Sequence, residues 1–253
     1  MGRTPAPFSL ALDGESGAAA TVHCAETVRA LPGKRLVCRG SWRQQLVYVK
    51  VYFGVDRHWQ AERRGLQALH EIYDVLGEKT VFLNAAGCMT LLSVYPFTPF
   101  RGSWLYTAMA SAPAGAQGVR DALDILLEQD RMPPEEDLRV VVLTGDGAAY
   151  GMGLSATSGA IERGLDFLYI VYDNEGYGNT GQQTSAATPH AASTATHGGR
   201  LGYPGFKKDL FAIWAAHQPG YLATVIGSEP LDVAKKVARA KQTEGPKMFI
   251  ALA

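Results

Sequence analysis

The chain has 253 residues, of which 47% are hydrophobic, so it can bury a sizeable core as one large domain or as one domain with a smaller piece. Its 24 basic and 24 acidic residues cancel, which gives no electrostatic reason to expect nucleic acid or an anionic membrane as a partner. Residues 1–12 lack the pattern of a signal peptide, and no run of about eighteen apolar residues predicts a membrane span, so the cytoplasm is the expected location.

Residues 1–72 have the pattern of a small β-β-α segment. Val- and Tyr-rich alternation predicts two strands with a turn at Gly40 and Ser41 between them, and apolar residues at helical spacing predict a helix after them. The strands are expected over residues 35–38 and 46–53, and the helix over residues 59–73. We expect this segment to be distinct from residues 73–253, where the composition changes.

Residues 73–253 alternate apolar strand patterns with helices rich in Gly and Ala, which is typical of a parallel sheet covered on both faces. The expected strands span residues 80–84, 139–144, 167–172, 221–226 and 247–252. The expected helices span residues 106–129, 153–163, 208–217 and 230–243. With right-handed crossovers, these elements make a doubly wound α/β domain. The stretch 176–205 has no periodicity, and so long a loop is usually functional.

A glycine-rich turn follows the second of these strands. Gly145 and Gly147 let the backbone approach a ligand closely, and the helix that follows offers free N–H groups suited to a diphosphate. A dinucleotide-binding turn is the alternative, because Asp166 lies about twenty residues on, as an acid for the ribose would. Against it, Tyr150 stands in place of the third glycine, and Asp146 would face the phosphates unless a metal intervened.

The end of the next strand brings a second group of oxygen ligands. Adjacent parallel strands end at the same edge of a sheet, so Asp146 and Asn174 can face one another. A hard divalent cation takes an octahedron of oxygens. The Asp146 carboxylate, the Asn174 side-chain carbonyl and the main-chain carbonyl of Gly176 would supply three of them. Two diphosphate oxygens and a water molecule would complete the set.

The residues around this pair resemble a known family. Gly145-Asp146-Gly147, with Asn174 after the next strand, resembles the thiamine diphosphate motif. Three further strings are similar to pyruvate:ferredoxin oxidoreductase and its 2-oxoacid relatives. They are Tyr-Asp-Asn-Glu-Gly-Tyr-Gly-Asn-Thr-Gly-Gln-Gln-Thr-Ser at residues 172–185, Ala-Thr-Pro at residues 187–189 and Lys-Lys-Asp-Leu at residues 207–210. The resemblance covers about residues 76–253.

This resemblance implies the thiamine diphosphate-binding fold and a set of cofactor residues. The residues implied are Gly145, Asp146, Gly147, Ala148, Asn174, Gly176, Asn179 and Thr180. Asp146, Asn174 and Gly176 would hold Mg²⁺. No catalytic side chain is assigned, because in this family the glutamate that activates the cofactor comes from a partner subunit or domain.

The activity implied is the oxidative decarboxylation of pyruvate or a related 2-oxoacid. The chain would act as the β subunit of a 2-oxoacid:ferredoxin oxidoreductase, together with an α subunit. The cofactor serves as the electron sink, electrons leave through iron–sulfur clusters to ferredoxin, and coenzyme A accepts the acyl group.

The cysteines depart from the family pattern. Cys88 resembles one of the four ligands of the family's [4Fe–4S] cluster, but no Cys-x-x-Cys pair lies upstream around residues 57–64, and no cysteine follows. The remaining cysteines, Cys24 and Cys38, belong to the other segment. We therefore expect an incomplete cluster site in a C-terminally truncated domain.

The N-terminal segment has a resemblance of its own. Lys50 in an expected strand and Glu62 in the expected helix resemble the small lobe of lipopolysaccharide-kinase-like proteins. No His-Arg-Asp or Asp-Phe-Gly sequence follows, so kinase activity is not expected. A solvated lysine and a helix-face glutamate are the alternative interpretation.

The leading hypothesis is thus a thiamine diphosphate-binding β subunit that follows an incomplete kinase-like fragment in the chain. Two alternatives stay open. The chain would be an inactive fusion or fragment product, or a non-redox thiamine diphosphate decarboxylase or synthase, which needs no cluster.

Overall fold

The computed structural model describes the backbone of residues 8–13, 19–31, 35–42, 45–52, 57–87, 90 and 100–253, and among these the side chains from residue 67 onward. The chain forms two compact units, one ending at Gln60 and one starting at Ala61. The helix α1 (Arg57–Leu76) begins in the first and ends in the second, and the expected boundary between residues 72 and 73 lies within it. Among the described helices, none is long and apolar enough to span a membrane.

The first unit contains a four-stranded antiparallel sheet in the order β1-β2-β3-β4. Its strands are β1 (Phe8–Asp13), β2 (Ala19–Leu31), β3 (Arg35–Trp42) and β4 (Gln45–Tyr52). The expected turn at Gly40 and Ser41 is wrong, because both residues pair with β4 inside the ladder, opposite Val47 and Leu46. A Gly-Ser pair is compatible with extended backbone, so it does not by itself end a strand.

The structure describes the backbone of the kinase-like pair but not its side chains. Lys50 belongs to β4 and Glu62 to α1. Both side chains lie outside the described residues, so their pairing stays a prediction.

The second unit contains a six-stranded, fully parallel sheet in the order β6-β5-β7-β8-β10-β9. Its strands are β5 (Thr80–Ala85), β6 (Ser103–Thr107), β7 (Arg139–Gly145), β8 (Leu168–Asp173), β9 (Tyr221–Ile226) and β10 (Lys247–Leu252). This confirms the doubly wound α/β fold.

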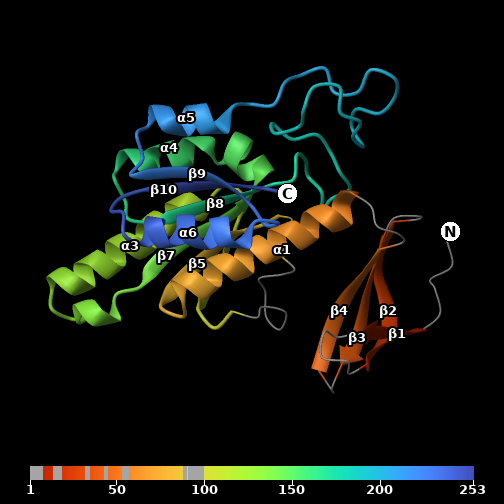
Figure 1. Ribbon diagram of the computed structural model, residues 1–253, viewed down its shortest axis with the longest axis horizontal. Helices are drawn as coiled ribbons and strands as arrows, with labels where there is room; N and C mark the ends of the chain where they lie inside the picture. The colour runs from red at the N-terminus through yellow and green to blue at the C-terminus, as the bar shows by residue number, and fades with distance from the viewer. Residues whose placement is uncertain are drawn as a thin grey trace. The chain divides into compact units, whose positions relative to one another are not determined.

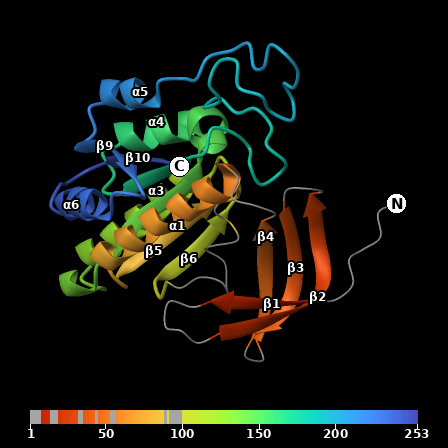
Figure 2. The ribbon, with the colours of Figure 1, turned by 45° about the vertical axis from the view of Figure 1, so that its right-hand side comes forward.

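Helices cover both faces of this sheet. On one face lie α1 and α6 (Pro230–Lys241) (Figure 1). Apolar residues of both helices pack on the strands. On the other face lie α3 (Ala112–Glu128), α4 (Leu154–Glu162) and α5 (Leu210–Ala216), and Figure 2 shows α4 and α5 side by side there. Strand β7 alternates accordingly: Val140 and Val142 join one core, and Val141 and Leu143 join the other.

The edge strand β6 differs from the sequence-based expectation, which placed a helix from residue 106. Residues 103–107 instead pair with β5, and α3 starts at Ala112 with Pro113 in its first turn. The exposed side chains of Leu105 and Tyr106 explain the error, because an edge strand shows no continuous buried pattern.

Candidate metal and cofactor site

The candidate site lies at the carboxyl ends of β7 and β8, which are neighbours at the centre of the sheet. Gly145 of β7 pairs with Tyr172 of β8, so the residues that follow each strand emerge side by side. Asp146 follows β7 directly, and Asn174 follows β8. Ligand sites of parallel sheets form at this edge.

Three of the residues predicted as metal ligands meet there. The Asn174 side-chain amide lies 2.8 Å from the main-chain oxygen of Gly176 and 3.1 Å from Oδ1 of Asp146. With its NH₂ group turned toward these oxygens, the amide donates two hydrogen bonds. With its oxygen turned toward them, three oxygens converge with no proton between them. That second arrangement needs a cation.

In that second arrangement, the spacing of the Asn174 oxygen from the other two oxygens fits Mg²⁺. In an octahedral Mg²⁺ site the metal–oxygen distance is about 2.1 Å, which places neighbouring ligand oxygens about 3 Å apart. The two separations from the Asn174 amide, 2.8 and 3.1 Å, match that value. The donor set of one carboxylate, one amide oxygen and one main-chain carbonyl also suits a hard cation.

The Asp146 carboxylate is held in a buried position. Only 1% of the residue is exposed, and burial raises its pKa from 3.8 to about 7, with the negative charge of Asp173 acting in the same direction. The hydroxyl of Ser185 donates to Oδ2 of Asp146, which leaves Oδ1 facing Asn174. A buried carboxylate with an elevated pKa is typical of a functional site.

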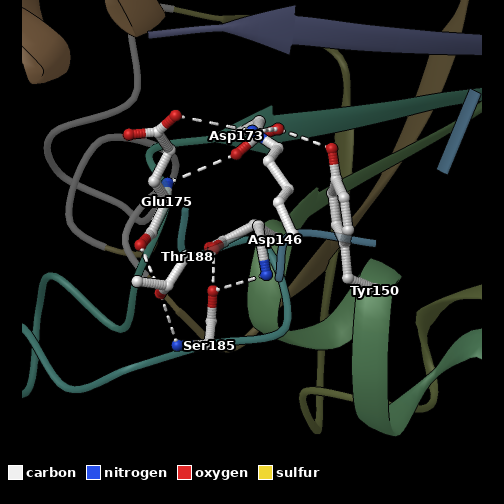
Figure 3. A network of polar contacts seen from close by, with 8 residues as sticks. Asp146, Tyr150, Asp173, Glu175, Ser185 and Thr188 are labelled. Carbon is white, nitrogen blue, oxygen red and sulfur yellow. Dashed lines mark hydrogen bonds and ion pairs between the residues drawn. The ribbon is translucent and has the colours of Figure 1, made fainter. Parts of the chain in front are cut away.

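Ser185 is fixed by its own hydrogen bonds (Figure 3). Its hydroxyl accepts from the Ala187 N–H at 3.1 Å, so its proton is directed at Asp146. Its backbone N–H donates to the Thr188 hydroxyl at 2.9 Å, which donates to the carbonyl of Glu175 at 2.7 Å. The turn at Ser185 therefore connects the Asp146 side of the site with the loop that carries Asn174.

We expect Ser185→Ala to weaken Mg²⁺ binding by about 10- to 100-fold, the range typical for loss of a residue that orients a metal ligand. Titration calorimetry with Mg²⁺ measures the effect. Ser158→Ala is the matched control, because it removes a hydroxyl that bonds His217 Nε2 at 2.7 Å, away from these oxygens. Equal affinity of Ser185→Ala and the wild type would contradict the assigned role.

A small pocket opens beside the carboxylate, lined among others by Gly145, Gly147, Ala148 and Tyr177. Gly147 begins a π-helical turn, η2 (Gly147–Met152), which leads into α4. A Cβ atom built on Gly147 would lie 2.1 Å from Cε1 of Tyr177. Only glycine therefore allows the Tyr177 ring to close on the turn that follows β7.

The dinucleotide alternative does not fit this geometry. Asp166 precedes β8, at the amino end of the sheet, where its carboxylate pairs with Lys247 of β10. The glycine-rich turn lies at the carboxyl end. An acid at the opposite edge cannot bind the ribose of a dinucleotide held at Gly145.

The remaining predicted site residues are Asn179 and Thr180, which follow Gly176 in the chain, and Cys88. The Thr180 hydroxyl bonds the carbonyl of Tyr177 at 3.2 Å and the side chain of Gln183, within the turn after Gly176. The contacts of Asn179 and Thr180 with a cofactor stay predictions. Cys88 lies outside the described residues. Among the side chains described, no cluster of three His, Cys, Asp or Glu could hold a metal.

A family model for the thiamine pyrophosphate enzyme, C-terminal TPP binding domain, matches residues 85–251. The chain belongs to this thiamine pyrophosphate enzyme family. It is 41% identical over 179 residues to a pyruvate synthase subunit PorB of Methanocaldococcus jannaschii, covering 69% of this chain and 60% of the relative. It is 37% identical over 178 residues to the PorB subunit of Thermotoga maritima, covering 69% of this chain and 55% of the relative.

This member of the family thus spans 60% or less of the length of these two curated relatives. A solved 2-oxoglutarate:ferredoxin oxidoreductase from Magnetococcus marinus, with 2-oxoglutarate, coenzyme A and succinyl-CoA bound, shares its fold at a TM-score of 0.61 and 20% identity. That alignment covers 78% of this chain and 61% of the other. The sheet and its helices are those of the thiamine diphosphate-binding fold.

Proposed function

We propose that this chain binds thiamine diphosphate and Mg²⁺ as the β subunit of a 2-oxoacid:ferredoxin oxidoreductase. The observation that carries the proposal is the meeting of the Asn174 side-chain amide with the main-chain oxygen of Gly176 and with Oδ1 of Asp146, at 2.8 and 3.1 Å. The similarity to PorB subunits supports the choice of enzyme class. A ketoisovalerate oxidoreductase subunit VorB of Pyrococcus abyssi is also 36% identical to this chain. The proposed substrate is therefore the class of 2-oxoacids and not pyruvate in particular.

Each residue of the site has a task in this proposal. Asp146, Asn174 and Gly176 would hold Mg²⁺, which in turn would bind the diphosphate oxygens. Gly147 and Ala148, at the start of the turn η2, would direct backbone N–H groups at the same diphosphate. Tyr177 lines one side of the pocket, against Gly147, and would limit the access of water to the bound cofactor. Bound thiamine diphosphate supplies an electron sink for decarboxylation.

The rest of the enzyme would come from partners. We propose an α subunit, ferredoxin, coenzyme A and the 2-oxoacid as the molecules with which the chain works. The side chain that activates the cofactor would belong to the α subunit. Ser185, on the loop beyond the metal site, would keep the Asp146 carboxylate in place.

Calorimetric titration with thiamine diphosphate tests the binding proposal. We expect a saturable signal in the presence of Mg²⁺ that is lost after chelation with EDTA. Thiamine without its diphosphate is the control ligand and should bind at least about 100-fold more weakly, because the metal contacts only the diphosphate. Equal binding with and without Mg²⁺ would refute the site.

The enzyme class is tested on the complex isolated from its own cells through a tag on this chain. We expect reduction of a viologen dye that requires both a 2-oxoacid and coenzyme A. Release of carbon dioxide at the same rate without the dye would identify a non-redox decarboxylase instead.

A further inference from the structure

The string Lys207-Lys208-Asp209 ends the long loop after β8, and each of its side chains has a defined partner. Lys207 Nζ lies 2.7 Å from Oδ2 of Asp173. Lys208 Nζ donates to the carbonyl of Tyr150 at 2.7 Å. Asp209 accepts the backbone N–H of Ala212 at 2.9 Å and so caps α5. Lys207 and Lys208 therefore fix the end of the loop to the sheet edge, and Asp209 fixes the start of the helix that follows.

Asp173 is the residue that Lys207 shares with Tyr150 and Glu175 (Figure 3). It is the last residue of β8, and its side chain is completely buried. Its Oδ2 also accepts the Tyr150 hydroxyl at 2.5 Å, and its Oδ1 accepts the N–H of Glu175 at 3.3 Å. A buried carboxylate is stable only when its charge is paired and its oxygens accept hydrogen bonds, and Lys207 supplies the charge.

The bonds of Asp173 connect the two halves of the metal motif. Tyr150 lies in the turn that follows Asp146, and Asp173 directly precedes Asn174. Glu175, between the two ligands of the second half, has a left-handed backbone with φ +61°. Such a conformation is unfavourable for a residue with a side chain, so the surrounding contacts must hold it. Lys207 Nζ also lies 3.6 Å from Oε1 of Glu175.

We propose that Lys207 is a positioning residue of the Mg²⁺ site. It pairs with Asp173 and, through Asp173 and Glu175, fixes the turn that presents the Asn174 and Gly176 oxygens. This inference rests on the proposed function. Charge alone predicts the opposite effect, because removing a cation near a metal site strengthens the attraction of the site for Mg²⁺. The direction of the change in affinity therefore separates positioning from simple electrostatics.

The test compares Lys207→Met with Lys207→Arg and with Lys236→Met, using Mn²⁺ alone as the probe and electron paramagnetic resonance as the readout. We expect Lys207→Met to weaken Mn²⁺ binding by about 10- to 100-fold and to change the spectrum of the bound ion. Lys207→Arg keeps the charge and should restore most of the affinity and the wild-type spectrum. Lys236→Met, which removes a partly exposed pair with Asp232 on α6, should leave both unchanged.

A second variant tests the inference independently in case Lys207→Met does not fold. Tyr150→Phe keeps the ring and removes only the hydroxyl bonded to Asp173, so it should also weaken Mn²⁺ binding without a change of charge. Unchanged or tighter Mn²⁺ binding in Lys207→Met would overturn the inference while leaving the proposed function standing. If the wild-type chain binds no Mn²⁺ even with thiamine diphosphate present, the inference and the proposed function are both refuted.

Discussion

Replacing Asp146 with asparagine is expected to abolish Mg²⁺-dependent cofactor binding and, at neutral pH, to stabilise the metal-free chain. Asp146 supplies the only carboxylate among the three proposed ligands, and a neutral amide is a much weaker ligand for a hard cation. The same carboxylate is buried, with 1% of the residue exposed. Ionising it without a metal costs free energy, and asparagine removes this cost without changing the shape of the side chain.

The pH dependence of stability follows from the two pKa values of Asp146. Its pKa is 3.8 in the unfolded chain, which is the ordinary value of an aspartate, and about 7 in the folded chain. Burial is the chief cause of the increase. Below pH 4 both states hold the proton, and the group has no effect on stability. As the pH rises from about 4 to about 7, only the unfolded state releases the proton, so the free energy of unfolding falls. At about 1.4 kcal/mol for each pKa unit, the loss is a few kcal/mol.

Urea denaturation at pH 5 and pH 8 measures this loss, with the wild type and Asp146→Asn compared in the presence of EDTA. The wild type should lose a few kcal/mol more than the variant between the two pH values. Saturating Mg²⁺ with thiamine diphosphate should restore the wild type at pH 8 and leave the variant unchanged. Asp232→Asn, which alters a partly exposed acid on α6, is the control. Equal pH dependence in the wild type and Asp146→Asn would refute the assignment.

The sequence predicts the parallel sheet because buried strands are apolar without interruption. Residues 140–143 of β7 face helices on both sides of the sheet, and that environment favours apolar residues at every position of the strand. The strands β1 and β2 of the first unit and the edge strand β6 were not predicted. For β6 the reason is visible, since its residues are mostly exposed and lack that signal.

The meeting of the three proposed metal ligands could be predicted for a topological reason. Neighbouring parallel strands end at the same edge of a sheet, so the residues after β7 and β8 are expected to meet there. This prediction needs no knowledge of how the chain between the two strands folds. Ser185 and Lys207 could not be placed in the same way. Both belong to a loop without periodicity, and Ser185 meets Asp146 across 39 positions of sequence. The strings that contain them resemble the family, but only the folded loop shows what the two side chains contact.

Replacing Gly147 with alanine is expected to destabilise the chain by about 1 to 3 kcal/mol, the usual cost of overpacking. Gly147 has no left-handed backbone, so alanine is conformationally acceptable there and by itself would favour the helical turn. The cost arises from the Tyr177 ring, because the new Cβ would lie 2.1 Å from Cε1 and 2.7 Å from Cζ. Since Tyr177 follows Gly176, moving the ring also displaces a proposed metal ligand, and Mg²⁺-dependent binding should weaken.

A double-mutant cycle isolates this contact. In a Tyr177→Ala background the ring is absent, so Gly147→Ala should cost little or even stabilise the chain in urea denaturation. Gly118→Ala on α3, where an added Cβ meets nothing within 4 Å, should be neutral or stabilising by up to about 1 kcal/mol. A cost of Gly147→Ala that persists without the Tyr177 ring would mean that the backbone itself requires glycine. A cost that disappears would mean that the glycine is there to let the tyrosine ring close the pocket.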